Sequence, residues 1–174
     1  MDEPRLSLSE HAVLGLLAEG PTHGFAIARE LAADGSIGRV LTVRRSLAYR
    51  ALDHLVAEGL ARPTRVEAGE AGPQRRVHRI TPAGRRLQGA WLERPVHHLR
   101  DMRLEFRLKL VLLDRLEASP RSLIRAQRDA LAPAFSTLRR PARSRTVDHV
   151  ELWRRHSTAA IAAYLDELER RTRR

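Results

Sequence analysis

The sequence contains no cysteine, a single lysine and few aromatic residues. The lack of cysteine excludes disulfides, thiolate catalysis, iron–sulfur clusters and zinc fingers with cysteine ligands. Aromatic residues make up 4% of the chain, which is too few to line a large cofactor pocket. We therefore expect no cofactor and a core built from Leu, Ala, Val and Ile side chains.

Long apolar runs are also missing. The longest uninterrupted run, Ala159 to Leu165, has seven residues, whereas a helix that spans a bilayer needs about 20. The N-terminus shows no basic segment followed by an apolar one, which a secretory signal would have. We expect a cytoplasmic protein without a membrane partner.

The charge is strongly positive, with 32 Lys and Arg against 21 Asp and Glu and a formal net charge of +11. This excess favours a polyanionic partner such as nucleic acid. The global charge is weak evidence, because arginine-rich chains are common in proteins from GC-rich genomes. The local pattern is stronger: four arginines and no acidic residue lie between Asp34 and Asp53.

The first sixty residues predict three helices. Ser7 and Glu10 form a capping-box pair, and the first helix ends at Gly20. Thr22 is the expected cap of a second helix that carries Phe25, Ile27, Ala28 and Leu31 and ends near Gly35. Residues 35–43 are expected to form a loop with one short strand. The third helix, about 44–58, is predicted to bury one apolar stripe, which consists of Leu47, Ala48, Ala51, Leu52 and Leu55.

The next twenty residues change to an extended pattern. Residues 60–67 and 75–81 resemble strands, and the glycine- and proline-rich segment between them predicts a β-hairpin. Three helices followed by a hairpin is the winged-helix order. In the second strand, alternation places His78 on the core side rather than toward a ligand. His23 is expected to be structural.

The second half is predicted to be helical. Thr81 and Pro82 begin a helix over 82–93, Pro95 precedes a longer one through Leu116, and Ser119-Pro120 caps the next. Residues 139–145 form a polar linker before a last helix over about 148–170. The predicted fold is mostly α with a small β-hairpin wing: a winged helix-turn-helix DNA-binding domain at 1–92 and a helical dimerisation domain at 93–174.

Several of these segments occur together in one known family. They are LSEHAVLGLL at 8–17, GPTHGF at 20–25, SLAYRAL at 46–52, EGL at 58–60 and RRVHRITPAG at 75–84. In this order they resemble the PadR family of bacterial transcription regulators, densely over the first ninety residues and more loosely over 103–116 and 152–168. Members of the family often have an aromatic residue where this chain has His78, and a larger apolar residue where it has Ala48.

The third helix carries the predicted contacts to DNA. In a winged helix this element enters the major groove. Arg44 and Arg45 at its start can pair with guanine, and Ser46 lets the helix terminus approach a phosphate. Arg50 shares that surface. By resemblance Tyr49 would contact the DNA backbone, although packing against the wing is the competing role. The wing would contact phosphates or the minor groove through Arg65, Arg75, Arg76 and Arg79.

The C-terminal half is expected to form a homodimer. Its predicted interface comprises Phe106, Leu110, Leu113, Trp153, Ile161, Leu165 and Leu168, although part of this apolar stripe must be intramolecular core. Some relatives sense planar hydrophobic compounds, which implies a ligand cleft lined by Trp91 and Trp153 for a small hydrophobic effector. One set of residues has the helical spacing of a possible metal site: His97, Asp101 and Glu105. A row of solvent-exposed side chains on one helix face is favoured instead, and we expect no metal.

The function expected from the sequence is a homodimeric, sequence-specific repressor that binds double-stranded DNA at a palindromic operator and is released by an effector. The alternatives are a nonspecific basic nucleic-acid-binding protein and an adaptor that keeps the fold without binding DNA. A small enzyme is disfavoured, because no phosphate loop and no nucleophile–base pair is evident.

Overall fold

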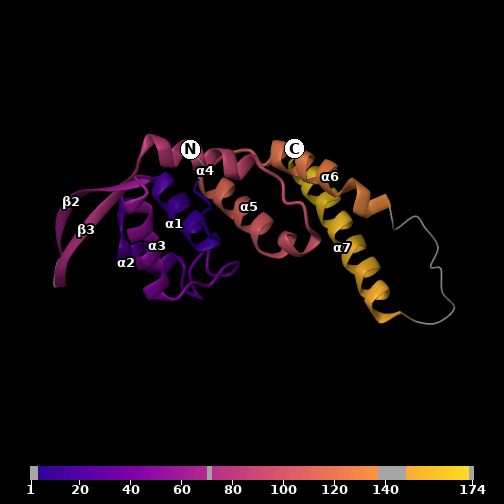
Figure 1. Ribbon diagram of the computed structural model, residues 1–174, viewed down its shortest axis with the longest axis horizontal. Coiled ribbons are helices and arrows are strands. Elements are labelled where there is room, and N and C mark those ends of the chain that lie inside the picture. Colours follow the sequence, from indigo (N-terminus) through magenta and orange to yellow (C-terminus); the bar gives the residue numbers. More distant parts are fainter. Residues whose placement is uncertain (1–3, 70–71, 137–147, 173–174) are drawn as a thin grey trace. The chain divides into compact units, whose positions relative to one another are not determined.

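The computed structural model describes residues 4–69, 72–136 and 148–172, and Figure 1 shows its helices and strands. The described residues fall into two compact units. The first unit lies within Met1–Leu92 and Arg107–Ala118, and the second within Glu93–Phe106 and Ser119–Arg174. Residues 107–118 are thus part of the N-terminal unit, which differs from the predicted boundary at 92.

The elements of the first unit are α1 (Leu8–Glu19), β1 (Thr22–His23), α2 (Gly24–Glu30), α3 (Arg45–Ala57), β2 (Ala61–Gly69), β3 (Gly72–Ile80), α4 (Pro82–Glu93) and most of α5 (Glu105–Arg115). The second unit contains the 3-10 helix η1 (Leu99–Arg103), α6 (Arg121–Ser136) and α7 (His149–Thr172). The fold is mostly helical with a small β-sheet wing, as predicted.

The three N-terminal helices pack around one apolar core. The capping box of α1 is present, with the Ser7 hydroxyl accepting from the Glu10 N–H and the Glu10 carboxylate accepting from the Ser7 N–H. Helix α3 packs against α1 and α2. Its buried side chains are those of Ala48, Ala51, Leu52 and Leu55. Leu47, predicted to be buried with them, is 43% exposed. It directly precedes Ala48 and therefore lies on a neighbouring side of the helix, outside this stripe.

The wing is a three-stranded antiparallel sheet with the order β1-β3-β2. The predicted hairpin is confirmed as β2 and β3, and its partner β1 pairs Thr22 with His78. The prediction that Thr22 caps the second helix is wrong, because Thr22 belongs to this strand. The cap is His23, whose imidazole Nδ1 accepts a hydrogen bond from the Ala26 N–H at 3.1 Å.

The segment between α2 and α3 contains no strand, so the short strand expected within 35–43 is wrong. The chain instead turns repeatedly, and the N–H groups of Ile37 and Gly38 both donate to the Glu30 carbonyl. A Cβ at Gly38 would lie 1.6 Å from the Ala32 carbonyl oxygen, so only glycine fits this turn. Ile37 and Val43 fill the core under the turn rather than extending a sheet.

Trp91 of α4 is part of the core of the first unit. The side chain is 8% exposed and stacks on the imidazole of His11, with ring centroids 3.9 Å apart. The ammonium of Lys109 lies 4.6 Å from the same indole. Gln88 fixes His11 through bonds to its ring and its carbonyl. These contacts cover the indole, so Trp91 does not line the ligand cleft that the sequence suggested.

An ion-pair cluster holds α5 in the first unit. Arg115 donates to Glu19 at 2.6 and 2.7 Å and to Glu30 at 2.9 Å. A hydrogen bond from Ser36, followed by the charge of Arg115, lowers the pKa of the Glu30 carboxyl against the opposing effect of burial. The Arg115 guanidinium thus joins three separate segments through its bonds to Glu19 and Glu30.

In the second unit, α6 and α7 pack against each other. Leu165 is fully buried, and the Gln127 side chain exchanges two hydrogen bonds with the backbone of Val96. Asp148 caps α7 by accepting from the N–H groups of Val150 and Glu151. The predicted linker at 139–145 lies outside the described residues.

The long helix expected to end at Leu116 is divided into η1 and α5, with Leu104 between them. His97 precedes η1, Asp101 belongs to η1 and Glu105 begins α5. The three residues therefore do not share the helical face that their spacing suggested. Within the described ranges, no set of three or more His, Asp or Glu residues is placed to hold a metal ion. None of the helices described is both long and apolar enough to cross a membrane.

The wing contains one buried polar atom whose removal is expected to stabilise the fold. Nδ1 of His78 is buried and has no hydrogen-bond partner among the described residues, and burial lowers the pKa of this imidazole. Replacing His78 with Phe removes the unsatisfied atom and keeps a planar ring. We expect the free energy of unfolding to rise by about 1 kcal/mol at pH 7, measured by urea denaturation.

The pH dependence of the same variant gives a second readout. Because the folded-state pKa of His78 is depressed, the unfolded chain takes up the proton first, and stability falls as the pH decreases below about 6.5. This loss is expected to be smaller in His78→Phe than in the wild-type protein. A destabilised His78→Phe would show that Nδ1 has a partner in solution.

Candidate nucleic-acid interface

The start of α3 presents a group of exposed cations. Arg44, Arg45 and Ser46 are exposed in its first turn, and Arg50 is exposed one turn later. Arg44 occupies the N-cap position without a side-chain cap bond, and the first turn has no acidic residue. Cations there oppose the helix dipole, and N–H groups of the first turn lack a side-chain acceptor. This terminus can therefore accept an external anion.

The same arginines have no internal counter-charge. Among the side chains that the structure describes, no carboxylate lies within ion-pair distance of Arg44, Arg45 or Arg50. Arg115 and Arg128, by contrast, are each paired with two acidic residues. The positive charge of α3 is therefore left for an external partner.

Two contacts fix α3 against the helices before it. The Tyr49 ring lies directly over Gly24, where an added Cβ would be 2.6 Å from Cε1. At the other end, Nδ1 of His54 lies 2.6 Å from the Glu10 carboxylate. Burial raises the pKa of Glu10, but hydrogen bonds from Ser7 and then the contacts with His54 outweigh it and leave the pKa lowered. Both ends of the exposed surface are thus held by α1 and α2.

A hollow of about 470 Å³ lies beside this surface, between the start of α1 and α3. Its lining residues are Ser7, Ser9, Glu10, Leu47, Arg50, Ala51, Asp53 and His54. The side of α3 that bears Arg50 is therefore not filled by the chain itself.

Phe25 of α2 joins α3 to the wing. Its ring is 42% exposed and lies 5.4 Å from the Arg45 guanidinium and 5.2 Å from that of Arg75. Arg45 is also 5.7 Å from the Tyr49 ring. Two predicted site residues, Arg45 and Arg75, therefore meet at an aromatic residue that sequence reasoning counted with the apolar positions of the second helix. A signal was available, since a helical wheel places Phe25 about 200° from buried Ile27.

The wing carries a second set of exposed arginines. Arg65, Arg75, Arg76 and Arg79 are all exposed, and the predicted core position of His78 is confirmed at 9% exposure. Arg62, which sequence reasoning omitted, lies directly opposite Arg79 in the β2–β3 register. Like charges opposite each other destabilise a strand pair. The Arg62–Arg79 pair therefore favours an anion on this face of the wing.

The residues predicted at the dimer interface have unequal exposure. Phe106, Leu113 and Leu165 are 0%, 9% and 0% exposed in the single chain, so their side chains are intramolecular core. Leu110, Ile161 and Leu168 are half-buried. Trp153 is 74% exposed and has surface available for a partner.

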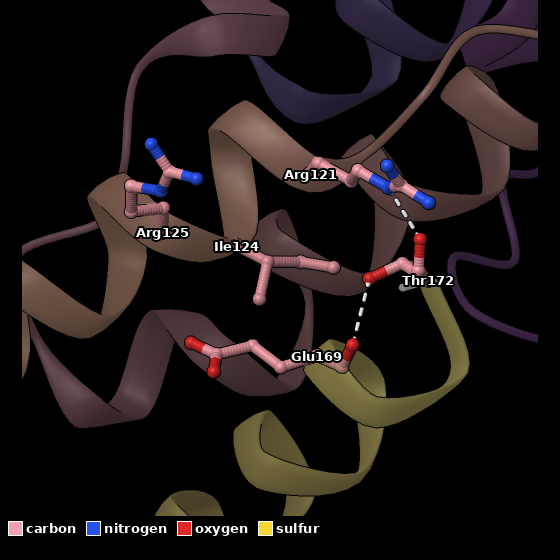
Figure 2. Close-up of a pocket in the computed structure, with 5 residues that line it drawn as sticks. All are labelled: Arg121, Ile124, Arg125, Glu169 and Thr172. Atoms are coloured by element: carbon pink, nitrogen blue, oxygen red, sulfur yellow. Dashed lines mark hydrogen bonds between the residues drawn. The ribbon is translucent and has the colours of Figure 1, made fainter. Parts of the chain in front are cut away.

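A small cavity of about 230 Å³ lies in the second unit where α6 begins and α7 ends. Figure 2 shows its lining residues, among which Arg121 donates to the Thr172 carbonyl at the end of α7. This contact satisfies a terminal carbonyl of the helix. The cavity is lined by Arg121, Ile124, Arg125, Glu169 and Thr172 and includes neither predicted cleft residue.

Part of the chain is similar to a known family of proteins. Residues 13–89 match the model of the transcriptional regulator PadR-like family, and this segment contains α2, α3 and the wing. No curated protein matches the chain. Among solved structures, the chain is similar to Bacillus subtilis PadR in complex with operator DNA, with 20% identity and a TM-score of 0.48 over 92% of this chain and 97% of that chain. The family match is thus to residues 13–89, which hold the candidate interface of α3 and the wing.

Proposed function

We propose that this protein is a sequence-specific regulator that inserts α3 into the major groove of double-stranded DNA. The observation that carries the proposal is the exposed start of α3, where Arg44, Arg45 and Arg50 have no carboxylate partner among the described residues. A guanidinium can bond guanine O6 and N7 together. Ser46 is small enough to let the helix terminus approach a phosphate.

The wing supplies the contacts that position α3. Its exposed arginines, including the Arg62–Arg79 pair, lie on β2 and β3, and β3 in turn pairs with β1 and contacts α2. Contacts to phosphates fix the register of a protein on DNA, while contacts to base edges select the sequence. We assign the first role to Arg65, Arg76 and Arg79 and the second to Arg44, Arg45 and Arg50.

We also propose that the protein acts as a homodimer on a palindromic operator, as a repressor. The support is an exposed apolar side of α7, on which Val150, Trp153 and Tyr164 are 59%, 74% and 39% exposed. Helical geometry places these three within about 60° of one another. A second copy can cover this side, and a hydrophobic effector that binds at Trp153 could change the spacing of two α3 helices.

Replacing Arg44 with Asp separates folding from DNA binding. Asp at the N-cap accepts a backbone N–H and matches the helix dipole, so we expect stability to rise by about 1 kcal/mol. Binding to DNA recovered with the wild-type protein should fall at least about tenfold. Thermal unfolding and mobility shifts with competitor DNA measure the two effects.

The matched control is Arg86→Asp, which makes the same charge change at an exposed position of α4. We expect it to leave specific binding close to that of wild type. Unchanged binding by Arg44→Asp would contradict the assignment of α3. If unrelated competitor DNA displaces the protein as effectively as the recovered DNA does, the result would support a nonspecific nucleic-acid-binding protein instead.

Replacing Trp153 with Glu tests the homodimer. A charge on the exposed side of α7 should convert dimers to monomers in sedimentation equilibrium and weaken operator binding, because a monomer contacts a single half-site. The neighbouring exposed residue of the same helix provides the control Arg154→Glu, which we expect to stay dimeric. A dimeric Trp153→Glu would exclude this side of α7 as the interface.

A further inference from the structure

We propose that Phe25 is a positioning residue for DNA binding. In this inference, which rests on the proposed function, its exposed ring holds one arginine from α3 and one from the wing in the orientation that contact with DNA requires. Phe25 would not itself bond to DNA. Its action is through Arg45 and Arg75, whose guanidinium carbons lie 5.4 and 5.2 Å from its centroid.

The placement of Phe25 is unusual for its residue type. Its neighbours Ile27 and Ala28 on α2 are buried, whereas the Phe25 ring is 42% exposed. Two guanidinium groups lie over this ring, and they come from two elements that are distant in sequence. An aromatic face attracts a guanidinium within about 6 Å. The exposed ring thus has a specific use that an apolar core residue would not have.

The same contacts limit the freedom of two long side chains. Arg45 lies close to the rings of both Phe25 and Tyr49, and the Tyr49 ring is fixed over Gly24. A free arginine loses rotamer entropy when it binds a phosphate, so an arginine that is already ordered binds at a lower cost. Consecutive residues of α2, Gly24 and Phe25, therefore order Arg45 of α3.

The ring also couples two elements that must contact DNA together. Arg45 and Arg75 carry like charges and share one aromatic neighbour. Their mutual repulsion is relieved when the negative backbone of DNA lies near both. Bound DNA excludes water from this surface, and each guanidinium–ring contact becomes stronger when it is desolvated. Loss of the ring should consequently weaken binding through both arginines.

The first test needs no DNA. In the NMR spectrum of the free protein, the ring current of Phe25 should shift the side-chain signals of Arg45 and Arg75. We expect Phe25→Leu to lose these shifts and Phe25→Tyr, which keeps the ring, to retain them. Unshifted arginine signals in wild type would overturn the proposal.

The second test measures binding to the operator by fluorescence anisotropy at fixed salt. We expect Phe25→Leu to bind roughly 5- to 30-fold more weakly, while Phe25→Tyr restores affinity. In the Arg75→Gln background the Phe25→Leu effect should shrink by roughly threefold, because one of its two partners is gone. In an Arg79→Gln background, which leaves the Phe25 contacts intact, the full effect should remain.

The outcomes separate this inference from the proposed function. A wild-type protein that protects no bounded operator would refute the regulator, while the NMR test would still establish or exclude the Phe25 contacts. If wild type binds its operator and Phe25→Leu binds equally well, the positioning role is refuted and the regulator stands. Thermal unfolding of each variant identifies any loss of affinity that arises from misfolding.

Discussion

The packing of α3 against α1 and α2 determines where the arginines of this helix lie. Ala48, Ala51, Leu52 and Leu55 form one buried stripe of this helix, so its opposite side must face solvent. Small alanines in the stripe allow the helices to approach closely. The Glu10–His54 contact then limits the remaining freedom of α3 about its axis. Base-edge contacts require such rigidity, because a hydrogen bond weakens steeply with misalignment.

Several charges of the candidate interface lower the stability of the protein when no DNA is bound. Arg44 and Arg45 oppose the dipole of α3, and Arg62 lies opposite Arg79 in the wing. A sequence selected only for stability would place acidic or capping residues at the helix start. Other helices follow these rules, with Ser7 capping α1 and Asp148 capping α7. Violations of local rules are typical of a functional site.

Local sequence signals predicted the Ser7 cap of α1, the β2–β3 hairpin and the exposure of the α3 arginines, because these depend on residues close in sequence. Features set by tertiary contact were missed. The turns at 31–43 depend on the Glu30 carbonyl, and the position of α5 depends on ion pairs between Arg115 and two distant glutamates. Trp91 was assigned to a cleft because its rarity is visible in the sequence, whereas its stacking on His11 is not. The role of Phe25 similarly depends on Arg75, fifty residues away.

The central claim is that the arginines of α3 contact base edges in the major groove. Methylation of guanine N7 by dimethyl sulfate reports this groove directly, because N7 is the atom that a bidentate arginine occupies. The account predicts guanines protected by the bound protein, in two clusters about one helical turn apart on one face of the operator. Bound protein that leaves every guanine N7 reactive, or that protects only minor-groove positions, would contradict it.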